Sequence, residues 1–399
     1  MRTLIKSANV WNEGHFTVKS VVIVDEKLEF VGTITEKDLA ENGTTLSQSG
    51  FDRVIDGTGK YLLPGVIDCH AHITMVCGTH HMADFFTASD SALTINAVIN
   101  AEKMVRCGIT TIRDCGGRFL ETLAVRDYIN SGKIIGPRLI CSGTPIKVIG
   151  GHEPGIDITG PYEARAKVRS LIHEGVDFIK VMVTGGLGKP GENPGNVEME
   201  PDELEAIVSE AAKHNRKAAC HCHSKEGMEI LVKAGAASIE HSTYLDSEIN
   251  EKIIENGVYV VPTFEPYINY ALLGEENNQL KDTVMAARAI IGEKKSRLYD
   301  AYKQGVKLAF GRDSGGFMMN QGSFVEEMIH MEEAGIERKD IITSATKNAA
   351  DLLGILDLTG TIETGKIADI ILLDADPLKG LYAYRDNLIG VWARGKYLN

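Results

Sequence analysis

Histidine, lysine and aspartate residues recur at the ends of apolar segments of this chain, and these residue types can hold metal ions. The first case is the segment Gly65–His72, in which His70 and His72 follow the apolar residues of a predicted strand. Side chains two positions apart on a strand point to the same side, so both imidazoles can reach one metal ion. Two ordinary histidines are the alternative, and a His-x-His pair by itself does not decide between them.

Further candidate ligands lie within or at the ends of four later apolar segments that we also predict to be strands. They are Lys180, His221, His223, His241 and Asp313. Lys180 lies between apolar neighbours, and burial of a bare ammonium group is costly, so a buried lysine here needs a partner. Structural alternatives exist for each residue, such as a core role for His241 or a helix cap for Asp313. Recurrence at five strand ends indicates one shared site better than any single pair does.

Cys220 and Cys222 alternate with His221 and His223, and together the four could suggest a structural zinc site. Alternate side chains on a strand face opposite sides, whereas a closed zinc site needs four converging ligands. We therefore interpret both cysteines as small apolar residues packed under helices. The chain has seven cysteines, an odd number that does not indicate a disulfide framework.

The candidate ligands lie in a central region where strands and helices alternate. We expect eight strands, at 65–72, 108–116, 138–143, 178–186, 217–223, 238–242, 258–264 and 307–315. Helices are expected between them, including 161–174, 201–214, 226–236 and 282–304. Such alternation predicts a parallel sheet, and eight units in about 290 residues predict an α/β fold of the (β/α)8 TIM-barrel type. An open, doubly wound sheet is the alternative.

The two ends of the chain are expected to form a second domain. Short strands are predicted at 4–10, 17–24, 28–31 and 54–63, and again at 360–362, 370–374 and 390–393. Neither end can bury a sizeable core alone, so we expect them to pair. The prediction is a small composite β-sandwich domain from residues 1–63 and 358–399, with the barrel at 64–357.

Charge and hydropathy exclude several classes of partner. The formal net charge is −13 and the isoelectric point is about 5.5, which argues against non-specific binding to nucleic acid or anionic membranes. The N-terminal residues lack the apolar run of a signal peptide, and no stretch approaches the length of a membrane span. We expect a cytoplasmic homo-oligomer that acts on a small molecule.

A glycine-rich segment after the fourth predicted strand matches the dinucleotide-binding pattern only weakly. Pro190 and Pro194 interrupt the helix that should follow the glycines and cradle a pyrophosphate. We interpret residues 185–195 as a mobile loop over the barrel mouth that could act as a lid. Loops 75–86 and 263–270 are expected to contribute pocket residues, with His80 and His81 on the substrate side or at the surface.

Two longer motifs resemble those of the amidohydrolase superfamily, in its binuclear-metal subtype. Residues 63–72 resemble the opening motif of the superfamily, and residues 360–369 with 374–378 resemble its closing signature. The resemblance covers nearly the whole chain and supports a β domain made from both ends. Residues 150–152 and 180–186 are similar to the branch that contains Xaa-Pro dipeptidases (prolidases), with imidazolonepropionase as a more distant relative.

The resemblance implies a centre of two zinc ions. Its ligands would be His70, His72, Lys180, His221, His241 and Asp313. The first two histidines and Asp313 would bind the more buried metal, and the other two histidines would bind the second. Lys180 would be carboxylated on its amine and bridge both metals, which also removes the cost of a buried ammonium group. The metals would activate a bridging hydroxide, with Asp313 as general base and then general acid.

The resemblance also implies three residues that contact the substrate: His152, His223 and Tyr244. His152 would help to polarise the scissile carbonyl and Tyr244 would contact a carboxylate of the substrate, although a packing role is equally open for the tyrosine. Related deaminases carry a glutamate three residues after the fifth-strand histidine, and Ser224 stands there, which disfavours deamination. Arg312 replaces the threonine common in this branch and should face away from the metals, with a salt bridge at the barrel rim.

We therefore predict a zinc-dependent amidohydrolase that cleaves a C–N amide bond, and more narrowly a dipeptidase of the Xaa-Pro or carboxypeptidase type. One alternative is a hydrolase of a non-peptide amide, lactam or urea, similar to imidazolonepropionase. Another is a non-catalytic protein that binds a metal or a ligand.

Overall fold

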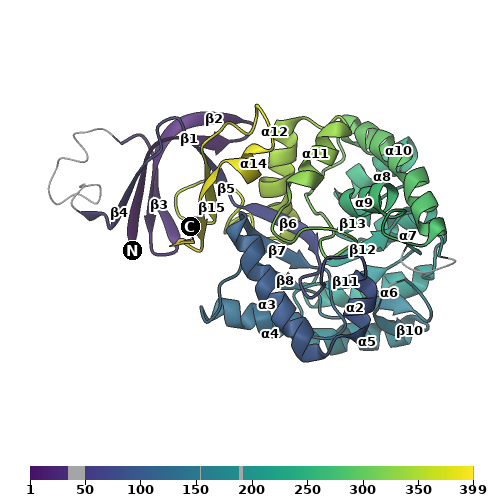
Figure 1. Cartoon of the computed structure of the whole chain (residues 1–399). Coiled ribbons are helices and arrows are strands. Elements are labelled where there is room, and N and C mark those ends of the chain that lie inside the picture. Colours follow the sequence, from purple (N-terminus) through teal and green to yellow (C-terminus); the bar gives the residue numbers. More distant parts are fainter. Residues whose placement is uncertain (35–49, 153, 188–191, 399) are drawn as a thin grey trace. The chain divides into compact units, whose positions relative to one another are not determined.

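The computed structural model describes residues 1–34, 50–152, 154–187 and 192–398. Residues 188–191 of the predicted lid therefore lie outside the described part of the chain. Two compact units are present (Figure 1), and the first comprises Met1–Ile67, Met104–Thr111 and Glu337–Asn399. The second comprises Asp68–Lys103 and Ile112–Ile336. Among the described residues, no helix combines the length and the apolar character that crossing a membrane requires.

An eight-stranded sheet made from both ends of the chain organises the first unit. The N-terminal part contributes β1 (Arg2–Asn12), β2 (His15–Val24), β3 (Lys27–Gly32), β4 (Arg53–Asp56) and β5 (Tyr61–Pro64). The C-terminal part contributes β15 (Ile370–Leu373), β16 (Leu388–Ala393) and β17 (Lys396–Tyr397). β5 and β15 run antiparallel with Leu63 opposite Ile371, which joins the two ends. One buried apolar cluster contains residues from both ends of the chain, among them Leu62, Ile370 and Trp392. The expected pairing of the chain ends is confirmed.

Two details of the strand prediction for this unit were wrong. The predicted strand 54–63 is two strands, because a turn at Gly57–Gly59 separates β4 from β5, with Lys60 N donating to Gly57 O at 2.9 Å. The predicted strand 360–362 is absent, since Gly360 has a φ of 91° and packs against Ala350. The unit also holds α12 (Arg338–Thr343), a π-helical turn (Ser344–Asn348), α13 (Ala349–Leu353) and α14 (Ala383–Asp386).

The barrel strands form two sheets. A three-stranded sheet contains β6 (Val66–Ala71), β7 (Ile109–Asp114) and β8 (Arg138–Cys141). A six-stranded parallel sheet contains β9 (Ile146–Val148), β10 (Ile156–Ile158), β11 (Ile179–Met182), β12 (Ala218–Cys222), β13 (Ser238–His241) and β14 (Tyr259–Val261). Asp177 N donates to Cys141 O at 2.8 Å and links the two sheets. β9 and β10 are short strands that the sequence did not predict.

The predicted eighth strand, 307–315, closes the barrel without forming a continuous strand. Its backbone pairs with β14 through Ala309 N and Val260 O at 3.0 Å, and with β6 through Cys69 N and Phe310 O at 2.9 Å. Asp313 has a φ of 58°, which lies outside the extended region that a strand requires. The segment therefore completes a (β/α)8 barrel by isolated bridges, and the predicted fold class is confirmed.

Helices follow the strands and surround the barrel. They are α2 (His81–Thr87), α3 (Asp90–Arg106), α4 (Glu121–Asn130), α5 (Pro161–His173), α6 (Pro201–Lys213), α7 (Lys225–Ala234), α8 (Ser247–Glu255), α9 (Glu265–Leu273), α10 (Lys281–Gln304) and α11 (Val325–Glu333). Local sequence signals set their ends. Ser224, for example, caps α7 by accepting a hydrogen bond from Gly227 N, and Gly235 ends it with a φ of 84°.

Candidate metal centre

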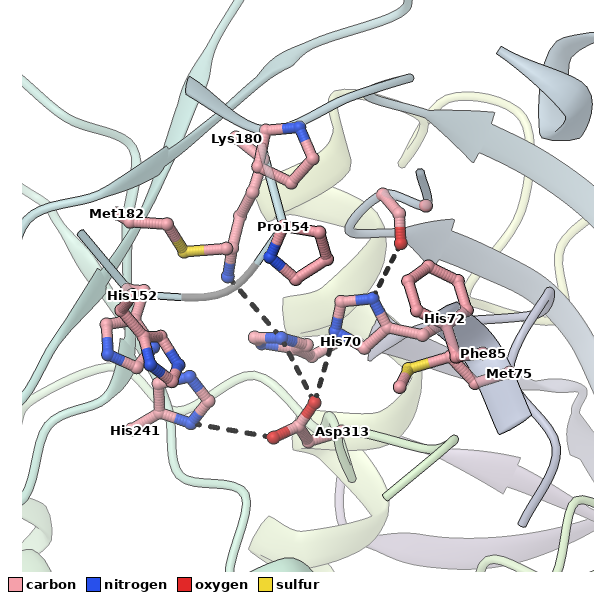
Figure 2. Close-up of a pocket in the computed structure, with 14 residues that line it drawn as sticks. His70, His72, Met75, Phe85, His152, Pro154, Lys180, Met182, His241 and Asp313 are labelled. Atoms are coloured by element: carbon pink, nitrogen blue, oxygen red, sulfur yellow. Dashed lines mark hydrogen bonds and ion pairs between the residues drawn. The ribbon is translucent and has the colours of Figure 1, made fainter. Parts of the chain in front are cut away.

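The side chains of all six predicted ligands lie together in the second unit. Figure 2 shows Lys180, His70, His72, His241 and Asp313 pointing toward one another. His70 comes from β6, Lys180 from β11, His221 from β12 and His241 from the last position of β13. These positions are at or near the carboxyl ends of barrel strands, where TIM barrels carry their chemistry.

Asp313 lies at the centre of the group. Its Oδ1 is 3.3 Å from His72 Nε2 and 3.5 Å from His70 Nε2, and its Oδ2 is 4.0 Å from His241 Nδ1. Lys180 Nζ is 3.4 Å from the same His70 Nε2. Ligand atoms of His70, His241 and Asp313 all lie within 4.8 Å of one another. Imidazole nitrogens and a carboxylate at such spacing suit a divalent ion such as zinc.

The histidine rings form a continuous array next to this aspartate. The ring centroids of His70 and His241 are 4.9 Å apart, those of His241 and His221 are 4.5 Å apart, and His152 stacks on His221 at 4.4 Å. Protonated imidazoles this close together repel one another. These rings are buried, so they cannot reduce the repulsion by turning toward solvent. The array is therefore suited to neutral rings that share cations.

Backbone geometry at the site supports a functional role. His241 has a φ of 73° and Asp313 a φ of 58°, values that residues other than glycine seldom adopt. A left-handed residue ends the alternation of β13, so that Glu240 and His241 both reach the same centre although neighbours on a regular strand face opposite sides. Such backbone strain tends to collect at functional sites.

Burial and neighbouring charges put His70, His221, His241 and Asp313 in the protonation states that metal binding needs. At His72, burial lowers the pKa, but the contact with Asp313 outweighs burial and raises it. Burial, with Lys180 nearby, lowers the pKa of His70 to about 4. Burial and the adjacent imidazoles hold the pKa of His221 and that of His241 well below the usual histidine range. Burial alone would raise the pKa of Asp313, but the facing histidines and Lys180 hold it well below its usual range. Neutral imidazoles and an ionised carboxylate are the forms that coordinate metals.

Lys180 occupies an unusual environment. Its side chain is 1% exposed, and among the described residues it forms no ion pair within 4 Å, its one hydrogen-bond contact being with His70. Transfer of a bare ammonium group into such a place costs several kcal/mol, on the order of 2–7 even for a neutral polar group. The environment is therefore better suited to an anionic derivative of the amine that is shared with cations.

A second set of polar groups orients the histidines from behind. Glu240 Oε2 accepts a hydrogen bond from His70 Nδ1 at 2.8 Å, and its Oε1 pairs with Arg113 Nη2 at 2.7 Å. His72 Nδ1 donates to Gly116 O at 2.7 Å. Carboxylate and carbonyl oxygens only accept hydrogen bonds, so the proton of each ring is on Nδ1 and Nε2 is left for a metal.

Glu240→Gln is expected to weaken metal binding about 10- to 100-fold, because the amide holds the Nδ1–H of His70 less strongly than the carboxylate does. The measurement is a competition titration of the metal-free protein against a chelator of known affinity. Ser238→Ala is the matched control, since it removes one contact to Glu240 and leaves the bond to His70. Equal metal affinity in wild type and Glu240→Gln would show that the carboxylate does not support the ligand.

The three predicted substrate residues occupy different surroundings. His152 lines the site, and its Nδ1 is 2.9 Å from Glu192 Oε1. His223 is buried, with Nδ1 at 2.7 Å from Thr243 Oγ1 and Nε2 at 3.2 Å from the hydroxyl of Tyr267. Tyr244 is partly buried and does not line either hollow described next. The geometry therefore brings His152 to the ligands, and the substrate roles of all three stay predictions.

Arg312, Cys220 and Cys222 lie away from the ligands. Arg312 is fully buried and pairs with Glu265, Nε and Nη2 each lying 3.1 Å from a carboxylate oxygen. It faces away from the metal ligands as expected, but inside the protein and not at an exposed rim, because the guanidinium finds this carboxylate and a backbone carbonyl there. Both cysteines are free and buried.

Two hollows adjoin the ligands, and both include His72, Met75, His152, His221, His241 and Asp313 in their lining. The first hollow (Figure 2) adds His70, Phe85, Gly116, Gly117, Pro145, Pro154, Lys180 and Met182. The second hollow adds His81, Met82, Gly186, Leu187, Pro266, Tyr267, Tyr270 and Gly316. Residues 263–270 were expected to supply pocket residues from a loop, and most of them form the start of α9. Tyr267 and Tyr270 belong to this segment, but the sequence did not single them out.

Comparison with known proteins identifies the family. Residues 61–398 match the model of the amidohydrolase family. Ochratoxinase of Aspergillus niger is 30% identical, with 94% of this chain and 82% of that protein covered. Imidazolonepropionase of Shouchella clausii is 25% identical, with 93% and 83% covered.

A solved structure, that of an Xaa-Pro dipeptidase with methionine bound in the active site, superposes with a TM-score of 0.89 at 30% identity, with the whole of both chains covered. The family match covers far more than half of the chain, and the superposition extends over both units. The chain belongs to the amidohydrolase family.

Proposed function

We propose that this protein is a zinc-dependent dipeptidase of the Xaa-Pro type, within the hydrolases of C–N bonds to which its family belongs. The observation that carries the proposal is the placement of Asp313 within 4.0 Å of three histidine side chains and near a buried lysine. This arrangement matches the donor set of a two-metal hydrolase. A similar chain of known structure is an Xaa-Pro dipeptidase, and it is covered in full.

The residues present fit a binuclear centre. His70, His72 and Asp313 would hold one cation, and His221 and His241 would hold the second. Bound metals would activate a water molecule and polarise the scissile carbonyl. Carboxylation of Lys180 would place an anion between the cations, and the absence of an ion-pair partner for this buried amine among the described residues supports that modification.

The chain's own residues would handle the proton. The carboxylate of Asp313 accepts a proton from the attacking water as the C–O bond forms at the amide carbon. It then delivers that proton to the amide nitrogen as the C–N bond breaks, so that the products are a free amine and a carboxylic acid, which releases its remaining proton to become a carboxylate. His152 is positioned to contact the carbonyl oxygen, because its ring stacks on that of His221 and its Nδ1 is held by Glu192.

A substrate panel tests the proposal. We expect the zinc-loaded protein to cleave at least one dipeptide with C-terminal proline, arginine or an apolar residue. The kcat/KM of the best dipeptide should exceed that of the best non-peptide amide, lactam or urea by at least about tenfold, which is about 1.4 kcal/mol. Cleavage of a non-peptide substrate without cleavage of any dipeptide would overturn the peptidase assignment.

Hydrolysis of a non-peptide amide is the second candidate function. It is favoured by two relatives whose names are not those of peptidases, ochratoxinase and imidazolonepropionase, each aligned over more than nine-tenths of this chain. The same panel separates the two candidates, because both use the same metal centre and differ only in which substrate is accepted.

A further inference from the structure

The second hollow differs from the metal centre in its chemistry. Beyond the site histidines and Asp313, its lining is apolar or aromatic and includes Met82, Leu187, Tyr267 and Tyr270. None of these described lining residues carries a formal charge at neutral pH. The one further ionisable residue of the lining is His81, and burial lowers the pKa of His81 to about 4, so its ring is neutral.

His81 and Tyr270 line the second hollow, and Phe317 packs against both of them; we call these three rings the aromatic wall. The rings of Tyr270 and Phe317 stack with centroids 4.8 Å apart and planes inclined by 14°. The Tyr270 hydroxyl is 3.4 Å from His81 Nε2, and the His81 ring is 6.2 Å from that of Phe317. Each ring is therefore held by the other two.

Tyr267 is fixed from behind by polar contacts. Its hydroxyl lies 3.2 Å from His223 Nε2, and Lys294 Nζ lies 4.3 Å from the centre of its ring. Lys294 is buried and donates to Thr263 O at 3.2 Å, so it does not reach into the hollow as a free cation. Apart from the site histidines and Asp313, the second hollow thus has rigid aromatic surfaces and an uncharged lining before any substrate arrives.

From this geometry we infer that the second hollow is the subsite for an uncharged aromatic or large apolar group of the substrate, with Tyr270 as the residue that determines this specificity. The inference rests on the proposed amide hydrolysis, because that group lies on one side of the scissile bond. A charged side chain that lies against Met82, Leu187 and Tyr270 would lose its hydration without an oppositely charged partner among these residues, whereas an aromatic ring would stack on Tyr270.

The test uses two series of dipeptides, Xaa-Pro and Ala-Xaa, in which Xaa is phenylalanine, leucine, alanine, aspartate or lysine. In one series we expect the kcat/KM of the dipeptide with phenylalanine to exceed that of the dipeptide with alanine at least about tenfold. It should exceed the kcat/KM of the dipeptides with aspartate and lysine by a larger factor. That series identifies the side of the bond that enters the second hollow.

Variants then assign the preference to Tyr270. Tyr270→Ala should reduce the phenylalanine-to-alanine ratio at least about fivefold, while Tyr270→Phe, which keeps the stacked ring, should retain it. Leu272→Ala is the matched control, since this residue lies on the same helix and is 68% exposed. Its ratio should equal that of the wild type.

A binding measurement separates this inference from the proposed function. Calorimetric titration of the zinc-loaded protein with N-acetyl-phenylalanine, phenylalaninamide and their alanine and aspartate counterparts should show tighter binding of a phenylalanine compound, lost in Tyr270→Ala. Selective binding without turnover of any dipeptide would overturn the dipeptidase and leave the subsite standing. Turnover with equal ratios in wild type and Tyr270→Ala, or tighter binding of aspartate, would overturn the subsite and leave the dipeptidase.

Discussion

An Asp313→Asn variant is expected to retain its bound metal and to lose about 100- to 10,000-fold in kcat. The side-chain amide keeps an oxygen that can coordinate a cation, but it cannot take a proton from water or return one to the leaving nitrogen. The measurement is steady-state turnover of the best dipeptide, together with metal content by plasma mass spectrometry.

Asp300→Asn is the control for the aspartate experiment, because this residue is exposed on α10 and lines neither hollow. Its turnover and metal content should equal those of the wild type. Wild-type turnover in a metal-loaded Asp313→Asn protein would contradict the proton-transfer role.

Lys180→Ala is expected to lose one or both metals and at least about a thousandfold in kcat, since each metal supplies several kcal/mol of charge stabilisation and each 1.36 kcal/mol is a tenfold change in rate. Acetate or propionate should restore part of the metal content and part of the kcat, because a small carboxylate can occupy the space of the missing carbamate. The control is Lys233→Ala, an exposed lysine on α7.

Carbon-13 spectroscopy checks the modification itself. Wild-type protein reconstituted with labelled bicarbonate and zinc should show one carbamate resonance, which Lys180→Ala should lack. Full metal content and turnover in Lys180→Ala would show that the lysine is not a ligand.

The ligands could be predicted from the sequence because each lies on or next to an apolar strand, and parallel strands bring their carboxyl ends to one rim of the barrel. The pairing of His70 with His72 needed only the twofold repeat of a strand. Their common placement with Lys180 and Asp313 followed from the predicted barrel, and the structure places these side chains within a few ångströms of one another. Their roles as ligands stay predictions until a metal is measured.

Residues that act through long-range contacts could not be predicted. Glu240 is adjacent to His241 in the chain, yet its partner is His70, 170 positions away, and the left-handed backbone at His241 that makes this possible has no sequence signal. The same holds for Asp313, where a positive φ interrupts the eighth predicted strand. Backbone strain of this kind is imposed by tertiary contacts and not by local preference.

The substrate side was the least accessible to prediction, because its residues lie on loops and on a short helix whose direction depends on packing. Tyr270 belongs to α9, and its stack on Phe317 and its contact with His81 direct it to the second hollow. Tyr244 was expected in the pocket from a resemblance alone, and it is not among the residues that line either hollow.

Anomalous diffraction from crystals of the zinc-loaded protein, recorded on both sides of the zinc absorption edge, tests the central claim most directly. We predict two zinc peaks about 3.5–4 Å apart, one within bonding distance of His70, His72 and Asp313, the other bound by His221 and His241, with density for a carboxylated Lys180 between them. A map without zinc at these side chains, from protein that still hydrolyses its substrate, would contradict the account.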